Sequence, residues 1–500
     1  MIALRALHER GLAVELVGDG EVQVRGVRHD SRAVEPGDLF VAISGQQADG
    51  ARFAASAVER GAVAVAAEST LALPADVPQL RVENARVALG ALAAAVYGDP
   101  TAELSVVGLT GTNGKTTTAW LVDEALSALG QRPALLGTVE SRGPGLREPA
   151  PFTTPEGDAL ARFARKVVDA GATHLVMEVS SHALGMHRAD AVHFAVAAFT
   201  NLTQDHLDYH GTMEAYFAAK ARLFTALSPG ASVINVDDPH GAQLADEVPG
   251  CLRVSREGDG DVAVRTWTMD RDGMRATVTA LGEEVELRSV LIGAHNLDNL
   301  LLALGVLVAL GFEADEAARA LGAAKGAPGR LERVDGLEDV RILVDYAHTP
   351  DALSRALAAL RPITPGRLFA VFGCGGDRDA AKRPQMGRAV ARGADLAVIT
   401  SDNPRTEDPM AILAAIEPGV RGEGWDACDD LVAFARADRG LYRVEEDRRA
   451  AIREAVSAAR PGDTILIAGK GHEDYQIRGT TKIHFDDREE ARAAIAGRSQ

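Results

Sequence analysis

A strand-like run that leads through a glycine loop into a helix constrains the fold of this chain more than any other feature. Residues 105 to 126 read SVVGLTGTNGKTTTAWLVDEAL, and the loop ends Gly114-Lys115-Thr116. This order predicts a phosphate-binding P-loop. Its backbone N–H groups and the helix N-terminus would cradle phosphates, Lys115 would neutralise the transferring charge, and the Thr116 hydroxyl would reach Mg²⁺.

The glycine spacing departs from the strict P-loop pattern. That pattern has a glycine five residues before Gly114, where this chain has Leu109, with Gly108 and Gly111 on either side. The alternative interpretation is a glycine turn that binds no nucleotide. The strand, lysine, threonine and helix in the expected order favour the P-loop.

Apolar runs and helical stretches alternate along the whole chain, which predicts an α/β protein with parallel sheets. Tyr97-Gly98-Asp99-Pro100 and Gly326-Ala327-Pro328-Gly329-Arg330 read as boundaries. We therefore expect three domains at residues 1–98, 99–330 and 331–500. The segment VRTWTMDRDGMRATVTAL is expected to form a hairpin-like insert in the central domain.

Composition excludes several classes of protein. The formal net charge of −18 would repel nucleic acid and anionic membranes. Three scattered cysteines lack disulfide or metal spacing, which fits a reducing cytoplasm. The run from Leu300 to Phe312 is shorter than the roughly 18 residues that span a membrane, so we expect a buried helix there.

Lysine is scarce in this chain, which has seven lysines and 46 arginines. Lysine differs from arginine in pKa, shape and nucleophilicity, so each lysine that remains reflects either chance or a need for an amine. Four of the seven fall in the segments discussed here: Lys115, Lys220, Lys382 and Lys470.

The segment LAVITSDNPRTEDP, residues 396 to 409, places a carboxylate and a guanidinium on either side of a proline. Asp402 and Arg405 could together bind a molecule that carries both an ammonium and a carboxylate. The alternative is an ordinary turn, because Asn-Pro favours turns anywhere.

Several long motifs, in order, resemble the Mur ligases and folylpolyglutamate synthetases, the ATP-dependent amide-forming ligases. They are the P-loop, VMEVSSHAL, TNLTQDHLDYHG, AHNLDNLLLAL, APGRLE and VDYAHTPDAL. Within this family HDSRAVEPGDLFVAISGQQADG, YFAAKARLF, GGDRDAAKRPQMG, DNPR and AGKGHEDYQ are most similar to members that add the third amino acid of the peptidoglycan stem peptide. The resemblance implies a ligase joining meso-diaminopimelate to UDP-N-acetylmuramoyl-L-alanyl-D-glutamate through an acyl phosphate. We also expect the protein to be a monomer.

The resemblance also implies a catalytic and metal site. Glu178, at the end of a strand-like run, and His206, in a following loop, would bind Mg²⁺ with Thr116. Lys220 would be carbamylated by CO₂ and would position the metal. The alternatives from the residues alone are a helix-capping glutamate, a packed histidine and a solvated surface lysine.

Substrate-binding positions follow from the same resemblance. Nucleotide contacts are implied for Gly111, Thr112, Asn113, Gly114, Lys115, Thr116, Thr117, Asn296, Arg330, Asp345 and His348. Contacts to the UDP-muramoyl dipeptide are implied for Ser31, Gln46, Gln47, Thr153, Thr154, Ser180 and Arg188. Met186 replaces a glutamine of the family, which puts one substrate hydrogen bond in doubt.

The diaminopimelate site is expected around the DNPR segment. Arg405 and Arg383 would bind the distal carboxylate, while Asp402, Asn403 and Glu473 would accept hydrogen bonds from the distal ammonium. Gly469 would lie close by, and Pro404 would fix the turn. The alternatives are a relative that adds lysine or a dipeptide, a folylpolyglutamate synthetase, or a P-loop switch or regulatory ATPase without ligase activity.

Overall fold

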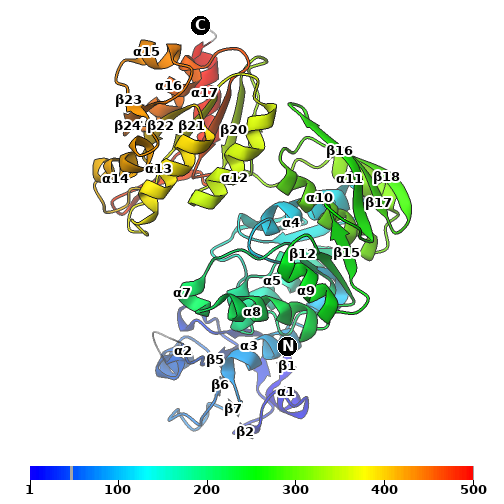
Figure 1. The fold of residues 1–500 in the computed structure, drawn as a ribbon. Helices are drawn as coiled ribbons and strands as arrows, with labels where there is room; N and C mark the ends of the chain where they lie inside the picture. The colour runs from blue at the N-terminus through cyan, green and yellow to red at the C-terminus, as the bar shows by residue number, and fades with distance from the viewer. Residues whose placement is uncertain (46–48, 499–500) are drawn as a thin grey trace. The chain divides into compact units, whose positions relative to one another are not determined.

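The computed structural model describes residues 1–45 and 49–498, so Gln46 and Gln47 lie outside the described residues. The chain forms two compact units. The first contains residues 1–266, 276–288 and 298–324, and the second contains residues 267–275, 289–297 and 325–500. Figure 1 traces both along the chain. The expected division into three domains stays a prediction.

The N-terminal part of the first unit has a sheet of its own, in the order β2-β7-β6-β5-β4. Its strands are β2 (Glu15–Val17), β4 (Gly26–Arg28), β5 (Asp38–Val41), β6 (Ala64–Ala67) and β7 (Gln79–Arg81). All neighbours pair in parallel except β2 and β7. Three helices accompany the sheet: α1 (Leu4–Glu9), α2 (Ala54–Glu59) and α3 (Ala85–Val96).

A larger sheet carries the P-loop, in the order β11-β10-β9-β12-β8-β13-β14-β15-β16-β17-β18. Its strands are β8 (Ser105–Thr110), β9 (Pro133–Leu136), β10 (Glu140–Gly143), β11 (Leu146–Pro149), β12 (His174–Glu178), β13 (Phe194–Phe199), β14 (Ala231–Asn235), β15 (Leu252–Ser255), β16 (Val262–Asp270), β17 (Gly273–Ala280) and β18 (Glu283–Ser289). From β9 to β16 the neighbours are parallel. The expected hairpin-like insert is formed by β16 and β17, which are adjacent.

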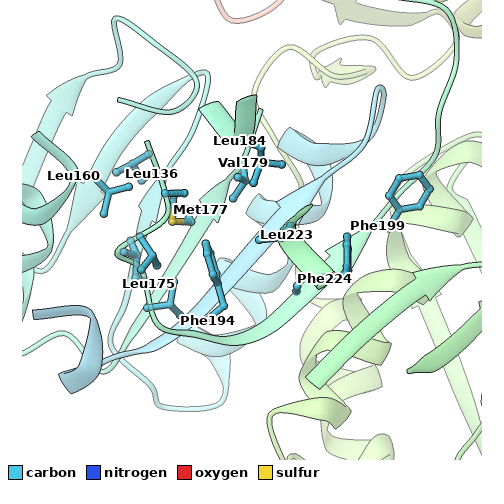
Figure 2. Close-up of a cluster of buried hydrophobic side chains, with 14 of the residues drawn as sticks. Leu136, Leu160, Leu175, Met177, Val179, Leu184, Phe194, Phe199, Leu223 and Phe224 are labelled. Carbon is cyan, nitrogen blue, oxygen red and sulfur yellow. The ribbon is translucent and has the colours of Figure 1, made fainter. Parts of the chain in front are cut away.

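Helices wrap this sheet: α4 (Lys115–Ala128), α5 (Gly157–Asp169), α6 (Ser181–Gly185), α7 (Leu207–His210), α8 (Met213–Thr225), α9 (Pro239–Glu247), α10 (Ala294–Ala309) and α11 (Ala314–Gly322). A cluster of buried side chains joins α5 and α8 to β12 and β13, as Figure 2 shows for Leu160, Leu223, Met177 and Phe199. This core fixes the carboxyl ends of the central strands, where the site residues begin.

The second unit has a sheet in the order β19-β20-β25-β21-β22-β24-β23. Its strands are β19 (Glu332–Val334), β20 (Arg341–Asp345), β21 (Leu368–Phe372), β22 (Leu396–Thr400), β23 (Asp426–Ala427), β24 (Leu441–Glu445) and β25 (Thr464–Ala468). The neighbours are parallel except β19 and β20. A separate hairpin pairs β26 (Tyr475–Arg478) with β27 (Thr481–His484).

Alternate residues of these strands enter two different cores. Leu343 of β20 packs with α12 (Pro350–Leu360), α13 (Lys382–Gly393) and α14 (Pro409–Arg421). Its neighbours Ile342 and Val344 pack with α15 (Leu431–Arg436), α16 (Arg448–Ala458) and α17 (Asp487–Arg498). Helices thus cover both faces, and the predicted α/β class with parallel sheets is confirmed.

The expected buried helix within residues 300–312 is also confirmed, because α10 contains Leu300, Leu301 and Leu304 at 0% exposure. Among the described residues, no helix combines the length and apolar character needed to cross a membrane.

Candidate active site

The P-loop lies after β8, the strand between β12 and β13. At two positions of the loop, the backbone conformation and the close neighbouring atoms require glycine. Gly111 has φ 139°, and a Cβ there would lie 1.9 Å from Thr200 Oγ1. Gly114 has φ 89°, and a Cβ there would lie 2.3 Å from Asn299 Oδ1. Both positions therefore exclude a side chain.

The loop that follows β13 holds the P-loop in shape. Thr112 N donates to Asn201 O at 2.8 Å, and Asn113 N donates to Asn201 Oδ1 at 3.0 Å. Thr203 N donates to Thr112 Oγ1 at 3.0 Å. Because β13 neighbours β8 in the sheet, two loops far apart in sequence meet at one edge. The sequence alone does not indicate this role for Asn201 or Thr203.

Two lysines converge on the same carbonyl oxygen. Lys115 Nζ and Lys220 Nζ each lie 2.8 Å from Gly111 O, and Lys115 also donates to Thr112 O. Lys220 is 1% exposed, so it is not a surface lysine. Burial, together with the neighbouring Lys115 cation, lowers the pKa of Lys220 well below its usual value.

Glu178 ends β12 beside the P-loop and is 1% exposed. Its carboxylate accepts hydrogen bonds from Thr116 Oγ1 at 2.9 Å and from Thr138 N at 2.7 Å. Thr116 and Glu178 therefore form an oxygen-rich pair at the start of α4, a donor set that suits Mg²⁺ shared with phosphates. Among residues 1–45 and 49–498, three His, Cys, Asp or Glu side chains do not gather into a metal-binding group.

His206 lies apart from these contacts in an exposed loop, with φ 52°. Its ring lies 4.8 Å from that of His182 and 6.2 Å from that of Tyr216. Lys220 Nζ lies 4.5 Å from the same Tyr216 ring. Tyr216 thus has both predicted residues as neighbours, and it was not anticipated from the sequence.

The residues expected to hold the UDP-muramoyl dipeptide gather near the end of β12. Thr154 Oγ1 donates to Glu178 O at 2.9 Å and accepts from Ser180 N at 3.0 Å. Arg188 donates to Thr154 O at 3.1 Å and pairs with Glu156 at 2.9 Å. The hydroxyl oxygen of Thr153 lies 3.0 Å from that of Thr138, and Thr138 in turn contacts Glu178.

Ser31 is the remaining described residue of the expected set, and Met186 lies beside Arg188. Ser31 is buried in the N-terminal part, at the start of a short 3₁₀ helix. Met186, the departure from the family, places its sulfur 3.4 Å from the Arg188 guanidinium. A thioether is a weak acceptor, so it leaves Arg188 available to a stronger one.

In the second unit, Asp345 ends β20 and accepts hydrogen bonds from Leu331 N at 2.7 Å and Ala347 N at 2.8 Å. Burial raises the pKa of its carboxyl group. The Arg330 guanidinium lies 4.7 Å from the Tyr346 ring, and His348 Nδ1 lies 2.8 Å from Tyr346 O. The predicted residues Arg330, Asp345 and His348 are thus brought together, while Asn296 lies in the first turn of α10.

The DNPR segment follows β22, and its neighbours at this edge follow β21 and β25. Asp402 and Asn403 are 7% and 4% exposed. Asn403 Nδ2 donates to Glu473 Oε2 at 2.9 Å, and a Cβ on Gly469 would lie 3.5 Å from Asp402 Oδ2. The structure brings four of the predicted amino-acid-binding residues together.

Arg405 has a left-handed backbone with φ 52°, which is uncommon for a residue with a side chain. The β26–β27 hairpin fixes it, because Arg405 N donates to Ile477 O and Gly479 N donates to Arg405 O. Its guanidinium donates to Gly376 O at 2.8 Å. Pro404 and Arg405 therefore lie in a loop that is fixed by hydrogen bonds to other segments, and not in an ordinary turn.

Arg383 is 5% exposed, and its guanidinium binds both carboxylate oxygens of Glu407, at 2.8 and 2.9 Å. Arg383 and Arg405 are thus each held by a group of the protein. No motif in the sequence indicates Glu407 as the partner of Arg383.

Lys470 and a buried ion pair support the DNPR segment from the interior of the second unit. Lys470 is 0% exposed and lies 3.4 Å from Asp402. Arg448 and Asp487, both fully buried, join at 2.7 Å, and Arg448 also donates to Ala468 O, directly before Gly469. Arg448 and Asp487 begin α16 and α17, so no local motif marks their pairing.

Comparison with known proteins places the chain in a family. Three family descriptions match it: "Mur ligase family, catalytic domain" at residues 23–97, "Mur ligase middle domain" at 109–307 and "Mur ligase, glutamate ligase domain" at 329–471. A Synechococcus elongatus protein named UDP-N-acetylmuramoyl-L-alanyl-D-glutamate--2,6-diaminopimelate ligase is 47% identical over 488 residues, which cover 96% of this chain and 95% of that protein.

The chain belongs to the Mur ligase family. A Streptomyces coelicolor protein with the same name as the Synechococcus one is 45% identical over 95% of this chain and 93% of its own length.

Solved structures agree with this membership. The structure of a protein with that name matches with a TM-score of 0.74 and 33% identity, and it covers 100% of this chain and 99% of its own. The Thermotoga maritima MurF ligase in complex with ADP shares the Mur ligase fold, with a TM-score of 0.62 and 21% identity over 95% of this chain and 98% of its own.

Proposed function

We propose that this Mur ligase joins meso-diaminopimelate to UDP-N-acetylmuramoyl-L-alanyl-D-glutamate with consumption of ATP, in peptidoglycan precursor synthesis. The observation that carries the proposal is identity of 44–47% over almost the full chain to eight relatives named for this reaction. The chain is an ATP-dependent amide-forming ligase. We further propose that it acts as a monomer in the cytoplasm.

The chemistry starts with activation of a carboxylate. The γ-phosphoryl group of ATP moves to the free glutamyl carboxylate, the P–O bond to ADP breaks, and an acyl phosphate forms. The amine of diaminopimelate then attacks the acyl carbon, inorganic phosphate leaves, and the amine loses a proton. Lys115, at the start of α4, neutralises charge on the transferring group.

Mg²⁺ would stabilise the negative charge that gathers where ATP meets the carboxylate. Thr116 and Glu178 fit this role, because their oxygens lie 2.9 Å apart beside the P-loop. We propose that His206 contributes from its exposed loop, and that Gly111 to Thr117 surround the phosphates. Contacts of Asn296, Arg330, Asp345 and His348 with the nucleotide are also proposed.

Carbamylation of Lys220 is supported by its environment. CO₂ reacts with a neutral amine, and burial favours the neutral form of Lys220 by lowering its pKa. The reaction forms an N–C bond and releases one proton, which leaves a carboxylate-like group in place of the amine. Such a group would place an anion suited to Mg²⁺ beside the Lys115 cation.

Binding of the UDP-muramoyl dipeptide is assigned to Thr153, Thr154, Ser180 and Arg188, with Ser31, Gln46 and Gln47. The distal end of diaminopimelate is assigned to Arg405 and Arg383 for its carboxylate and to Asp402 and Glu473 for its ammonium, with Gly469 alongside. Lysine lacks the distal carboxylate and would leave the Arg405 guanidinium without an anion.

Phosphate release tests the proposal against a P-loop ATPase that does not ligate. We expect release from ATP only when both UDP-N-acetylmuramoyl-L-alanyl-D-glutamate and meso-diaminopimelate are present. Release that needs neither would support the ATPase. Release that proceeds equally well with lysine would support a lysine-adding ligase.

A further inference from the structure

The amide of Asn403 has its acceptor capacity filled by the protein. Asn403 Oδ1 accepts from Ile477 N at 2.9 Å and from Lys470 Nζ at 3.1 Å. An amide oxygen has two lone pairs, so both are used. On the other side, Nδ2 has two N–H groups, and one donates to Glu473 Oε2 at 2.9 Å.

This arrangement corrects the expectation that Asn403 accepts a hydrogen bond from a distal ammonium. Asn403 has one N–H left to offer and no acceptor capacity to spare. It can therefore serve an anion, while Asp402 and Glu473 retain carboxylate oxygens for a cation. The two ends of a zwitterion would thus meet different side chains of one loop.

Lys470 determines this orientation. Its Nζ lies 2.7 Å from Tyr475 O, 3.1 Å from Asn403 Oδ1 and 3.4 Å from Asp402 Oδ1. An ammonium has three donors and no acceptor, so two hydrogen-bond acceptors and the neighbouring Asp402 carboxylate suit its protonated form. A rotated Asn403 amide would turn its NH₂ group toward this ammonium and toward Ile477 N, and all three would be donors.

Lys470 also balances the charge of the pocket. Asp402 and Glu473 supply two carboxylates, while Lys470 and Arg405 supply two cations, and Lys470 lies 3.9 Å from Glu473 Oε2. A balanced set suits the distal end of an amino acid that carries one ammonium and one carboxylate. Without Lys470 the set becomes more negative and suits an ammonium alone.

We propose that Lys470 is a positioning residue for amino-acid selection: it holds Asn403 as a donor to the distal carboxylate and keeps the pocket neutral. This inference rests on the proposed function for the identity of the amino acid. Lys470 itself need not touch the substrate, because its contacts are with the protein groups that would.

The test compares Lys470→Met, Asn403→Asp and wild type on the full chain. Dissociation constants and kcat/KM are measured for meso-diaminopimelate and for L-lysine on the same preparations, with thermal unfolding as a check of folding. Lys482→Met is the matched control, since Lys482 is an exposed lysine on the neighbouring β27 strand.

In Lys470→Met, we expect the preference for meso-diaminopimelate over lysine to fall about tenfold or more. The KM for ATP and the values for lysine should change little. Structural damage would instead lower both amino acids together. Asn403→Asp keeps Oδ1 and removes the N–H donor, so it should lose the same preference. Lys482→Met should retain it.

An unchanged preference in folded Lys470→Met would overturn the proposal. If that variant does not fold, an unchanged preference in Asn403→Asp would overturn it. Failure of the proposed ligase function can be distinguished from failure of the Lys470 proposal. A wild type that binds meso-diaminopimelate selectively without ligating it refutes the ligase function, and the dissociation constants of the variants then test the role of Lys470. A wild type with no selectivity in binding or turnover refutes both.

Discussion

Two buried lysines of this chain lie in opposite electrostatic surroundings. Lys220, in the first unit, is 1% exposed and donates to Gly111 O, and the neighbouring charge with the largest effect on it is another cation, Lys115. Lys470, in the second unit, is 0% exposed, with the carboxylate oxygens of Asp402 and Glu473 at 3.4 and 3.9 Å.

The difference shows that burial alone does not decide what a lysine does. Burial lowers the pKa of both side chains, but Asp402 opposes the shift at Lys470, while Lys115 adds to it at Lys220. The first environment favours a neutral, nucleophilic amine, and the second favours a structural cation.

The largest effect is expected from Lys220→Ala. Ligation should fall below detection and should return in part when short carboxylic acids are added, because they can occupy the place of a carbamate. In ¹³CO₂-equilibrated enzyme, ¹³C NMR should show a carbamate signal that Lys220→Ala loses and Lys470→Met keeps. An active wild type without the signal would contradict carbamylation.

Arg405→Ala should remove selectivity with a smaller loss of total activity. We expect wild type to prefer meso-diaminopimelate to lysine by about 10³-fold, and the variant to lose most of this preference. Arg439→Ala, at a loop position after α15, is the control. The measurement is kcat/KM for both amino acids in each protein. An equal preference in Arg405→Ala and wild type would refute the assignment of Arg405 to the distal carboxylate.

Asp487→Asn should destabilise the second unit. It leaves the fully buried Arg448 guanidinium without its carboxylate, which costs about 3–5 kcal/mol. Thermal unfolding should shift down by roughly 6 °C or more. Asp438→Asn breaks an exposed pair with Arg460 and should shift it little. Equal midpoints in the two variants would show that the buried pair adds no stability.

The smallest effect concerns His472, which follows Lys470 in the same loop. Burial, with the Arg330 cation, lowers the pKa of His472 to about 4. Below pH 6.5 the unfolded chain therefore binds a proton that the folded chain does not. The free energy of unfolding then decreases as the pH is lowered. His472→Gln should reduce this loss of stability between pH 7 and pH 5 by about 2 kcal/mol, measured as the free energy of unfolding at each pH.

His193→Gln is the control for this titration, because His193 is largely exposed. A pH dependence in His472→Gln that equals that of wild type would mean that His472 does not contribute to the acid loss.

Local motifs predicted the parts of the molecule that are set by neighbouring residues. The P-loop follows from the strand, its glycines and the helix, and the alternating runs predicted the α/β sheets. Strand adjacency then explains why Thr116 and Glu178 meet. These two residues are 62 positions apart, but Thr116 follows β8 across the P-loop, Glu178 ends β12, and β8 and β12 pair in parallel.

Residues that act through other residues were harder to find. Lys470 meets Asn403 across 67 positions, and Arg448 meets Asp487 across 39, in contacts that depend on how loops and helices pack. The orientation of the Asn403 amide depends on the backbone of Ile477, which sequence patterns do not reveal. Lysine scarcity drew attention to Lys470 but did not indicate its role.

A competition between the two amino acids tests both the ligase activity and its amino-acid selectivity. Wild type is given ATP, Mg²⁺, UDP-N-acetylmuramoyl-L-alanyl-D-glutamate and equal concentrations of meso-diaminopimelate and L-lysine, and the products are identified by mass spectrometry. We expect the diaminopimelate-containing tripeptide product, one phosphate released for each molecule formed, and at most a trace of the lysine product. Comparable amounts of both products, or ATP consumption without either, would contradict this expectation.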